Sequence, residues 1–481
     1  MPSSECIVVG SGMAGLVAAA RLTAHGHHVT VLEQREQAGG YFGGFRNDAG
    51  DHFDLAVSHL LGGHPGGALH TLLHELGLEH AVHLEPVDIA DVMVIGDRRI
   101  TLPTGLDRLQ KSLGVQFPES TADLTAFFGF MREFLGGADD DGSQDKGRFM
   151  MRNYRRGFEE FCTATIADPL LRTALAMRIQ CDESSLMIMA GFFTECYAKG
   201  MVSLRGGMRT LVDALVGYIT ATGGEVLLGA EVTALLAADG IARGVQLADG
   251  STRAGDVILY NGDVFALERM LSEHGGTGIV VEGRRRGHSS LSLFLTLEGV
   301  DLSRFAGAAR HYLTDTDDVF ETYRVLETGR LPHHPVIKLH FPSRIDPSLA
   351  APGRDLMRVE VDMYHDEEAH DEAFYDEYAQ AIEGLVARLL VPELREHCVY
   401  RRVATPLDYL RWFGHRGGSA TGWAHDVDNY LVRRISQRTS LQNTFITGQW
   451  GEHGSGLPQL IASAARSISL AENWLRKRAQ Q

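Results

Sequence analysis

The spacing of apolar residues changes along the chain, and each spacing predicts a type of secondary structure. Residues 6–9 are a short apolar run that predicts a buried strand, and an alanine-rich helix and a second strand over 28–32 follow it. Much later, apolar and polar residues alternate over 291–297 and 357–363. This period of two predicts antiparallel strands with one face on a core or cavity and the other towards polar surroundings.

Apolar residues at helical spacing occur between these strands. They predict helices over residues 68–78, 121–135, 186–193, 207–220, 374–389 and 458–470. Residues 136–143, rich in glycine and aspartate, predict an exposed loop. The chain therefore combines a β-α-β start with a separate region of antiparallel strands and helices.

The turn after the first strand carries the first candidate chemistry. Gly10, Gly12 and Gly15 form a Gly-x-Gly-x-x-Gly motif between strand and helix, where they permit a tight turn, backbone approach to a pyrophosphate and close helix packing. Glu33 ends the second strand, 23 residues after Gly10, close to the spacing of an acid that binds a ribose hydroxyl. Together these features predict a dinucleotide site, which also includes Met13, Ala14 and Gln34.

The residues that follow suggest which dinucleotide is bound. The pair Gly39-Gly40, then Phe45-Arg46 and Phe53-Asp54-Leu55, resembles the FAD-binding start of the phytoene desaturase and carotenoid isomerase group, a branch of the flavin amine oxidase superfamily. The resemblance implies that Glu33 holds the adenosine ribose, that the glycine pair lies along the pyrophosphate, and that the Phe-Asp stretch returns beneath the flavin. Arg46 joins the cofactor residues on the same basis.

Two later segments resemble the same family. Residues 204–263 match its central segment, which implies that the backbone of Val232 contacts adenine. Residues 443–470 match its last segment, a strand ending at Gly448 and a loop through Gly456 and Leu457 into a helix that begins near Pro458. In the family, this helix start points at the pyrimidine edge of the flavin, where its partial positive charge stabilises the reduced ring.

Three residues are candidates for a catalytic role. His453 stands where the family has a proline, which places an imidazole that titrates near neutral pH in a loop expected to border the flavin. It could instead bond a backbone carbonyl or solvent. Glu452 is a weaker candidate by adjacency, and His59 is another because it follows Phe53-Asp54.

Composition and charge exclude several classes of function. The formal charge of −17 argues against nucleic acid as a partner and gives no attraction to anionic lipid, so membrane contact is peripheral at most. The five cysteines are scattered and lack metal-type spacing, which indicates a reducing compartment with neither a disulfide framework nor a metal site. With no signal segment or membrane span in the pattern, we expect a cytoplasmic protein.

We therefore expect an α/β protein in which a doubly wound, Rossmann-like FAD-binding domain is interrupted by an α+β substrate domain with an antiparallel sheet and a helical cap. The expected FAD-binding parts are residues 1–100, 200–285 and 405–481, and the substrate-binding or cap parts are 101–199 and 286–404. The expected reaction is hydride or electron transfer at flavin N5 with a long, apolar, polyene-like substrate, by desaturation or saturation. A second nucleotide fingerprint is missing from the sequence, so the electrons are expected to go to oxygen, a quinone or a redox protein.

Other functions stay open at this point. The first is a flavin-dependent isomerase, cyclase or reductase of a polyene natural product, and the second is an amine-oxidase-type enzyme. A non-enzymatic binding module of the Rab escort or GDP-dissociation-inhibitor type shares the architecture, but those proteins lack the intact fingerprint found here.

Overall fold

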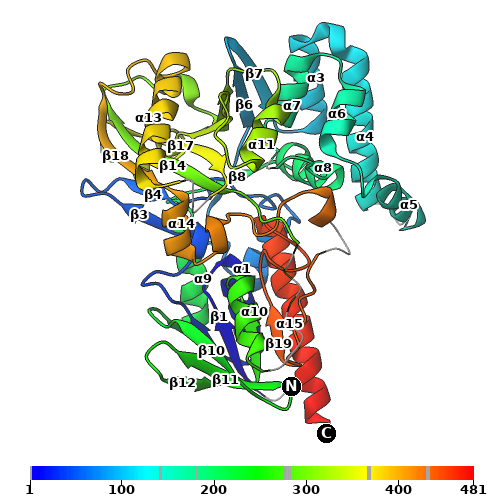
Figure 1. The fold of residues 1–481 in the computed structure, drawn as a ribbon, viewed down its shortest axis with the longest axis vertical. Helices are drawn as coiled ribbons and strands as arrows, with labels where there is room; N and C mark the ends of the chain where they lie inside the picture. Colours follow the sequence, from blue (N-terminus) through cyan, green and yellow to red (C-terminus); the bar gives the residue numbers. More distant parts are fainter. Residues whose placement is uncertain are drawn as a thin grey trace.

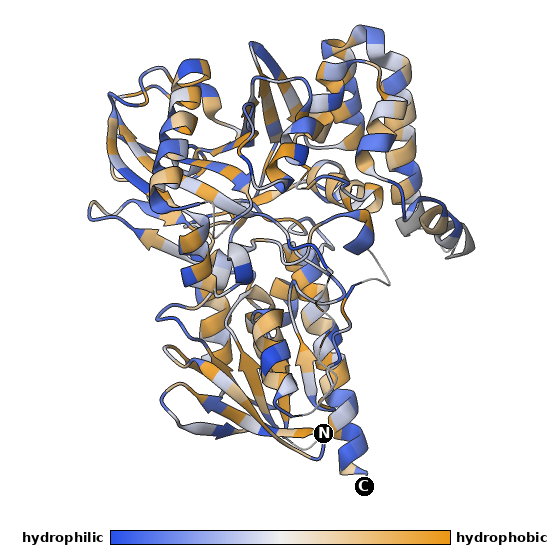
Figure 2. Ribbon diagram, viewed as in Figure 1, coloured by the Kyte–Doolittle hydropathy of each residue, from blue (hydrophilic) through white to orange (hydrophobic). Residues whose placement is uncertain are grey.

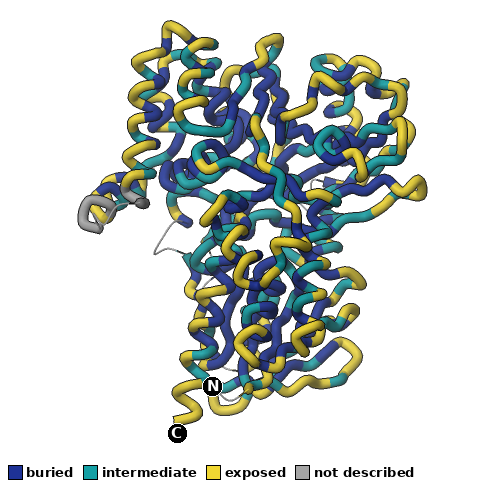
Figure 3. Tube along the Cα trace, turned by 180° about the vertical axis from the view of Figure 1, so that it is seen from behind, coloured by how far each residue is buried: buried dark blue, intermediate teal, exposed yellow. Residues whose placement is uncertain are grey.

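The computed structural model describes residues 3–139, 143–179, 181–274, 279, 281, 283–365, 370–429 and 434–480. The chain forms two lobes, with both termini at the far end of the narrower one (Figure 1). Buried segments run through the centre of each lobe and exposed segments surround them (Figure 3). We call the lobe with the termini the lower lobe and the wider one the upper lobe.

A parallel sheet forms the centre of the lower lobe. In the described residues it has five strands in the order β19-β13-β1-β2-β9, all pairs parallel. Their bounds are Glu5–Val9 for β1, His28–Leu32 for β2, Glu225–Leu227 for β9, Val257–Tyr260 for β13 and Thr444–Ile446 for β19. The strands come from the beginning, middle and end of the chain, so the predicted β-α-β start is confirmed and is completed by distant segments.

Both faces of this sheet are buried, which explains the continuous apolar run in β1. Cys6 and Val8 pack with the helices α1 (Met13–Ala24), α9 (Arg209–Ala221) and α15 (Leu457–Ala479). Ile7 and Val9 pack on the opposite face, with α10 (Val264–Ser272) and a three-stranded antiparallel sheet. The strands of that small sheet are β10 (Val232–Ala238), β11 (Ile241–Leu247) and β12 (Thr252–Ala254).

The upper lobe contains a mixed sheet. Its strands, among the residues described, follow the order β18-β14-β17-β16-β15-β6-β7. They are β6 (Ile89–Ile95), β7 (Arg98–Pro103), β14 (Ser289–Glu298), β15 (Ala308–Thr314), β16 (Ile337–His340), β17 (Arg354–Met363) and β18 (Cys398–Ala404). The antiparallel expectation holds for the pairs of β14 with β17 and β18, whereas β15 and β6 pair in parallel.

The alternating strand β14 is buried on both faces, which differs from the expected half-exposed strand. Leu291 and Leu293 join the large upper core, while Ser292 and Phe294 on the other face are equally buried. That second face is covered by the hairpin of β3 (Gly44–Arg46) and β4 (His52–Asp54) and by α14 (Pro406–Phe413). Figure 2 shows the mixture of apolar and polar residues in the strands of the upper lobe, and in β14 both kinds are buried from Ser289 to Leu297.

Helices cover the rest of the upper lobe. They are α3 (Leu106–Gln116), α4 (Thr121–Asp139), α5 (Ser143–Asn153), α6 (Phe158–Thr165), α7 (Pro169–Ala176), α8 (Leu186–Phe193), α11 (Val319–Glu327) and α13 (Glu372–Leu389). The loop predicted for 136–143 is wrong at both ends, because α4 continues to Asp139 and α5 begins at Ser143; residues 140–142 lie outside the described residues. None of the helices described is both long enough and apolar enough to cross a lipid bilayer.

The hairpin of β6 and β7 belongs to the upper sheet. The boundary expected at residue 100 would run through β7, which spans Arg98–Pro103. The sheet hydrogen bonds place this whole hairpin with the upper lobe, because β6 pairs with β15 as well as with β7.

Candidate cofactor and substrate cavity

A cavity of about 430 Å³ lies where the two lobes meet. The lower lobe contributes the glycine loop after β1 and the residues after β2 and β13, and the upper lobe contributes residues of β14, β15, β16 and β17. The cavity therefore reaches from the predicted dinucleotide loop to the sheet of the upper lobe.

The glycine loop has the geometry that a dinucleotide requires. Gly10 has a φ of +93°, a backbone conformation that favours glycine. A Cβ at Gly15 would lie 2.2 Å from the carbonyl oxygen of Gly10, so only glycine lets α1 pack this closely against the turn. The cap of α1 is Gly12, which has no side chain to accept the first N–H groups of the helix. Those groups and the positive helix end suit a phosphate.

Asn261, which follows β13, connects this loop to the last segment of the chain. Its side-chain amide, oriented so that both ends are satisfied, donates to Thr447 O at 3.1 Å and accepts from Gly12 N at 3.2 Å. A Cβ at Gly12 would lie 2.7 Å from this amide, and one at Gly448 would lie 2.5 Å from it. The absence of a side chain at Gly12 and at Gly448 therefore leaves room for the side chain of Asn261 between the two segments.

Glu33 is buried at the cavity wall and also holds the loop in place. Its Oε2 accepts from Ser11 N at 2.8 Å and from Ser11 Oγ at 2.6 Å, and its Oε1 accepts from Arg35 N at 3.0 Å. The glycine loop and the residues after β2 thus fix the position of the Glu33 carboxylate at the cavity wall.

We expect Glu33→Ala to weaken FAD binding by about 1–3 kcal/mol, because one charge-assisted bond to the cofactor is lost and the buried Ser11 donors lose their acceptor. Titration of the apoprotein with FAD, followed by flavin fluorescence, measures the change. Glu36→Ala, which removes an exposed carboxylate from the same loop, is the matched control. Equal affinities for the two variants would show that Glu33 does not hold the cofactor.

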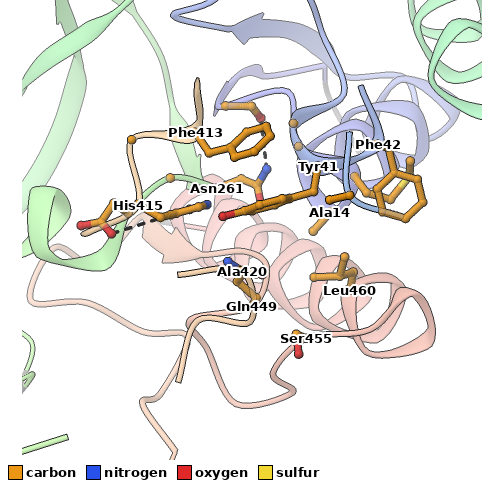
Figure 4. Close-up of a pocket in the computed structure, with 18 of the residues that line it drawn as sticks. Ala14, Tyr41, Phe42, Asn261, Phe413, His415, Ala420, Gln449, Ser455 and Leu460 are labelled. Carbon is orange, nitrogen blue, oxygen red and sulfur yellow. Dashed lines mark hydrogen bonds and ion pairs between the residues drawn. The ribbon is translucent and has the colours of Figure 1, made fainter. Parts of the chain in front are cut away.

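Rings form one part of the wall. The centroids of Tyr41 and Phe413 lie 4.0 Å apart, and Tyr41 stacks on His415 at 5.7 Å (Figure 4). Tyr41 donates its hydroxyl to Ser419 O at 2.7 Å, and burial raises its pKa well above the ordinary value, so it stays a neutral donor. These residues provide a flat, aromatic surface beside the glycine loop.

Most of the predicted site residues line this cavity. They are Gly10, Gly12, Met13, Ala14, Glu33, Gln34, Gly40, His59, Val232, Gly456 and Leu457. Gly15, Gly39 and Gly448 lie just behind the wall, where Gly39 donates to Ser11 O at 3.0 Å and Gly15 supports the turn. They shape the loop without facing the cavity.

Three predicted residues lie elsewhere. Arg46 is exposed and donates to Gly50 O at 2.6 Å, because the hairpin of β3 and β4 directs it away from the cavity. Glu452 accepts from Gln437 N at 3.3 Å and has Arg466 within 3.8 Å. His453 is partly buried in the loop before α15 but is not part of the cavity wall. The structure therefore does not bring His453 and Glu452 together with His59.

Several lining residues have no counterpart in the sequence predictions. Besides Tyr41 and Asn261, the wall includes His288, Arg310, Lys338 and Glu360. The polar alternation of the upper-sheet strands was the available signal for Glu360, but a period of two does not say whether the polar face meets solvent or a cavity.

The chain is similar to known proteins over nearly its full length. It is 26% identical over 502 residues to the 4,4'-diapolycopene oxygenase of Methylomonas sp, with 96% of each chain covered. It is 25% identical to the phytoene desaturase of Neurospora crassa, covering 96% of this chain and 83% of that protein. The structure of an oxidoreductase from Methanosarcina mazei matches with a TM-score of 0.64 at 14% identity, covering 97% of this chain and all of that one.

The family model described as "Flavin containing amine oxidoreductase" matches residues 13–275, more than half of the chain. The expected fold class and the expected cofactor, FAD, are confirmed by this match together with the fold, and so is the expectation of an FAD-dependent oxidoreductase. The dinucleotide loop, the completed parallel sheet and the family match agree: the chain belongs to the flavin containing amine oxidoreductases.

Proposed function

We propose that this FAD-dependent oxidoreductase removes hydrogen from a long, mainly apolar polyene, as the carotenoid desaturases named among its relatives do. The observation that carries the proposal is the similarity to the Neurospora phytoene desaturase over 96% of the chain. The cavity supports it, because Val57, Leu60, Leu61 and Phe192 form an apolar part of the wall. The relatives do not favour a reaction on a small polar amine.

Within this proposal, the lower lobe holds FAD and the upper lobe holds the substrate. Gly10, Gly12, Met13 and Ala14 would contact the pyrophosphate, Glu33 and Gln34 the adenosine ribose, and Val232 the adenine. Bound FAD would be the acceptor of the two electrons removed from the substrate. The start of α15, at Gly456 and Leu457, lines the cavity with the positive end of a 23-residue helix, which favours negative charge nearby.

The two-domain division follows the same assignment. We place residues 89–199 and 286–404 in the substrate domain and the remainder in the FAD domain, because β6 and β7 are hydrogen-bonded into the upper sheet. The electrons would pass to oxygen, a quinone or a redox protein.

The test uses the purified, FAD-loaded protein mixed anaerobically with phytoene in liposomes or with putrescine. We expect phytoene to bleach the flavin and to gain absorbance at longer wavelength as its conjugation grows. Bleaching by the amine alone would overturn the proposal in favour of an amine oxidase. Conversion of a polyene over many turnovers without an electron acceptor would instead indicate an isomerase or cyclase. Gly12→Val, expected to lack FAD, is the control.

A separate experiment concerns the catalytic role predicted for His453. The imidazole is outside the cavity wall, and burial lowers its pKa, so it is neutral at pH 7. We expect His453→Gln to keep turnover close to that of the wild type at matched FAD content. A loss of about 10²-fold or more, with a changed pH profile, would restore the role of proton carrier. The turnover of His59→Gln is measured alongside, because His59 lies in the cavity wall and His453 does not.

A further inference from the structure

Ionisable side chains gather at the end of the cavity formed by the upper sheet. We call this the sheet end and define it by His59, His288, Arg310, Lys338 and Glu360, all of which line the cavity. His59, His288 and Lys338 are each more than nine-tenths buried. Buried charge is costly unless it is paired, so a site that only had to accept hydrocarbon would gain nothing from these groups.

Most of this charge is paired within the protein. Lys338 Nζ lies 2.5 Å from Asp362 Oδ1 and 3.4 Å from Glu360 Oε1. Arg358 forms an ion pair with the other oxygen of Glu360. Lys338 and Arg358 are therefore balanced by two carboxylates, and this part of the sheet end carries no net charge.

Arg310 has no such partner. It projects from β15, and the structure places Asp91 opposite it on β6, but Asp91 pairs with Arg178 and accepts a hydrogen bond from Tyr197. Arg310 Nη2 instead lies 3.5 Å from the sulfur of Met201. Its Nε is buried and has no hydrogen-bond partner among the described residues. The sheet end thus holds one guanidinium that no carboxylate in the described part of the chain pairs with.

Two histidines with ring nitrogens unpartnered within the described part of the chain line the same cavity as Arg310. His59 is 92% buried, and neither of its ring nitrogens has a hydrogen-bond partner in the described structure. Burial, then the charges of Arg310, Arg178 and Arg358, lower the pKa of His59 well below its ordinary value. His59 is therefore neutral and offers one N–H, and the buried Nε2 of His288 is likewise unpartnered among described residues.

We propose that the sheet end binds a carboxylate at one end of the substrate, with Arg310 as its counter-ion and His59 as a further donor. A guanidinium matches a carboxylate with two parallel N–H groups. The apolar wall at Val57, Leu61 and Phe192 would contact the hydrocarbon that follows. This inference rests on the proposed function and narrows it: the preferred substrate is a polyene with an acidic end, and a pure hydrocarbon such as phytoene binds more weakly.

Binding without turnover tests the proposal. Equilibrium dialysis of the oxidised, FAD-loaded protein compares retinoate with retinol, which have the same polyene and differ at the end group. We expect the wild type to bind retinoate about 10- to 100-fold more tightly than retinol, because the carboxylate gains one or two charge-assisted hydrogen bonds. Arg310→Met should remove this preference and leave retinol binding unchanged, and Arg310→Lys should keep part of it.

The matched control is Arg98→Met, which removes an exposed arginine from the same sheet and should change neither affinity. Flavin absorbance shows that each variant is folded and loaded. Equal affinity of the wild type for both polyenes, or an equal effect of the two arginine variants, would overturn the carboxylate site. Binding of neither polyene would overturn this proposal and the polyene substrate together. A retinoate preference without conversion of any polyene would overturn only the proposed reaction.

Discussion

Replacing Gly12 by valine is expected to abolish FAD binding. A Cβ at this position would lie 2.7 Å from the side-chain amide of Asn261, which accepts from Gly12 N and donates to Thr447 O. The φ of Gly12 is −61°, so valine is excluded by lack of space rather than by backbone strain. Overpacking costs about 1–3 kcal/mol, and displacing the loop also removes N–H groups from the pyrophosphate. We expect an affinity loss of about 100-fold or more.

The measurement is the flavin-to-protein absorbance ratio after purification, followed by FAD titration of the apoprotein. Gly217→Val is the matched control, because Gly217 lies in α9, is exposed, and has no described atom within 4 Å of an added Cβ. It should retain FAD. A Gly12→Val protein with the flavin content of the wild type would show that the glycine loop does not form the cofactor site.

The second large effect is expected from Glu360→Gln. Glu360 is paired with Arg358 and lies 3.4 Å from Lys338, and Arg358 is only 3% exposed. Removing the carboxylate leaves a buried guanidinium without its ionic partner, which costs about 3–5 kcal/mol of unfolding free energy. Urea denaturation of the FAD-loaded protein measures this loss.

The same variant should change the response to acid. Burial alone would raise the pKa of Glu360, but Arg358 and Lys338 lower it to about 2 in the folded protein. A lowered folded-state pKa means that the stabilisation is complete above the ordinary value of 4.5 and is lost as the pH falls towards 2. We expect the wild type to lose this stability between pH 4.5 and 2 and Glu360→Gln to lack that part of the pH dependence.

Glu321→Gln provides the control for both measurements. Glu321 makes the same type of contact with Arg324, at 3.0 Å, but its side chain is 61% exposed. An exposed ion pair contributes about 0–1 kcal/mol, so this variant should remain close to the wild type. Equal stability of Glu360→Gln and Glu321→Gln would contradict a buried, stabilising charge cluster at the sheet end.

The cofactor half of the site could be predicted from the sequence because it depends on local geometry. Gly10, Gly12 and Gly15 act within one turn, and the same turn contacts Glu33 at the end of the neighbouring strand. Backbone conformation and parallel pairing over a short crossover are encoded by nearby residues. The predicted β-α-β start and most of the predicted cofactor residues therefore lie where the pattern placed them.

The resemblance located segments of the chain but did not determine the direction of every side chain in them. Arg46 was assigned to the cofactor, but in a two-stranded hairpin successive side chains point to opposite faces, and that of Arg46 turns towards Gly50. His453 lies in a loop whose backbone approaches the cavity through Ser455 and Gly456 while the imidazole stays outside the wall. Motif position determined the loop but not the direction of these side chains.

The sequence by itself determined the dinucleotide loop, the parallel strands beside it and the presence of a second, alternating sheet. Only the tertiary structure decided what the polar face of that sheet meets. Arg310, Lys338 and Glu360 lie on the consecutive strands β15, β16 and β17, and the neighbouring places of these strands in the sheet bring the three side chains to one end of the cavity. The physical reason is that an alternating pattern assigns each residue to one of the two faces of a strand but does not say what covers each face. That depends on how the β3-β4 hairpin, α14 and the lower lobe pack against the sheet.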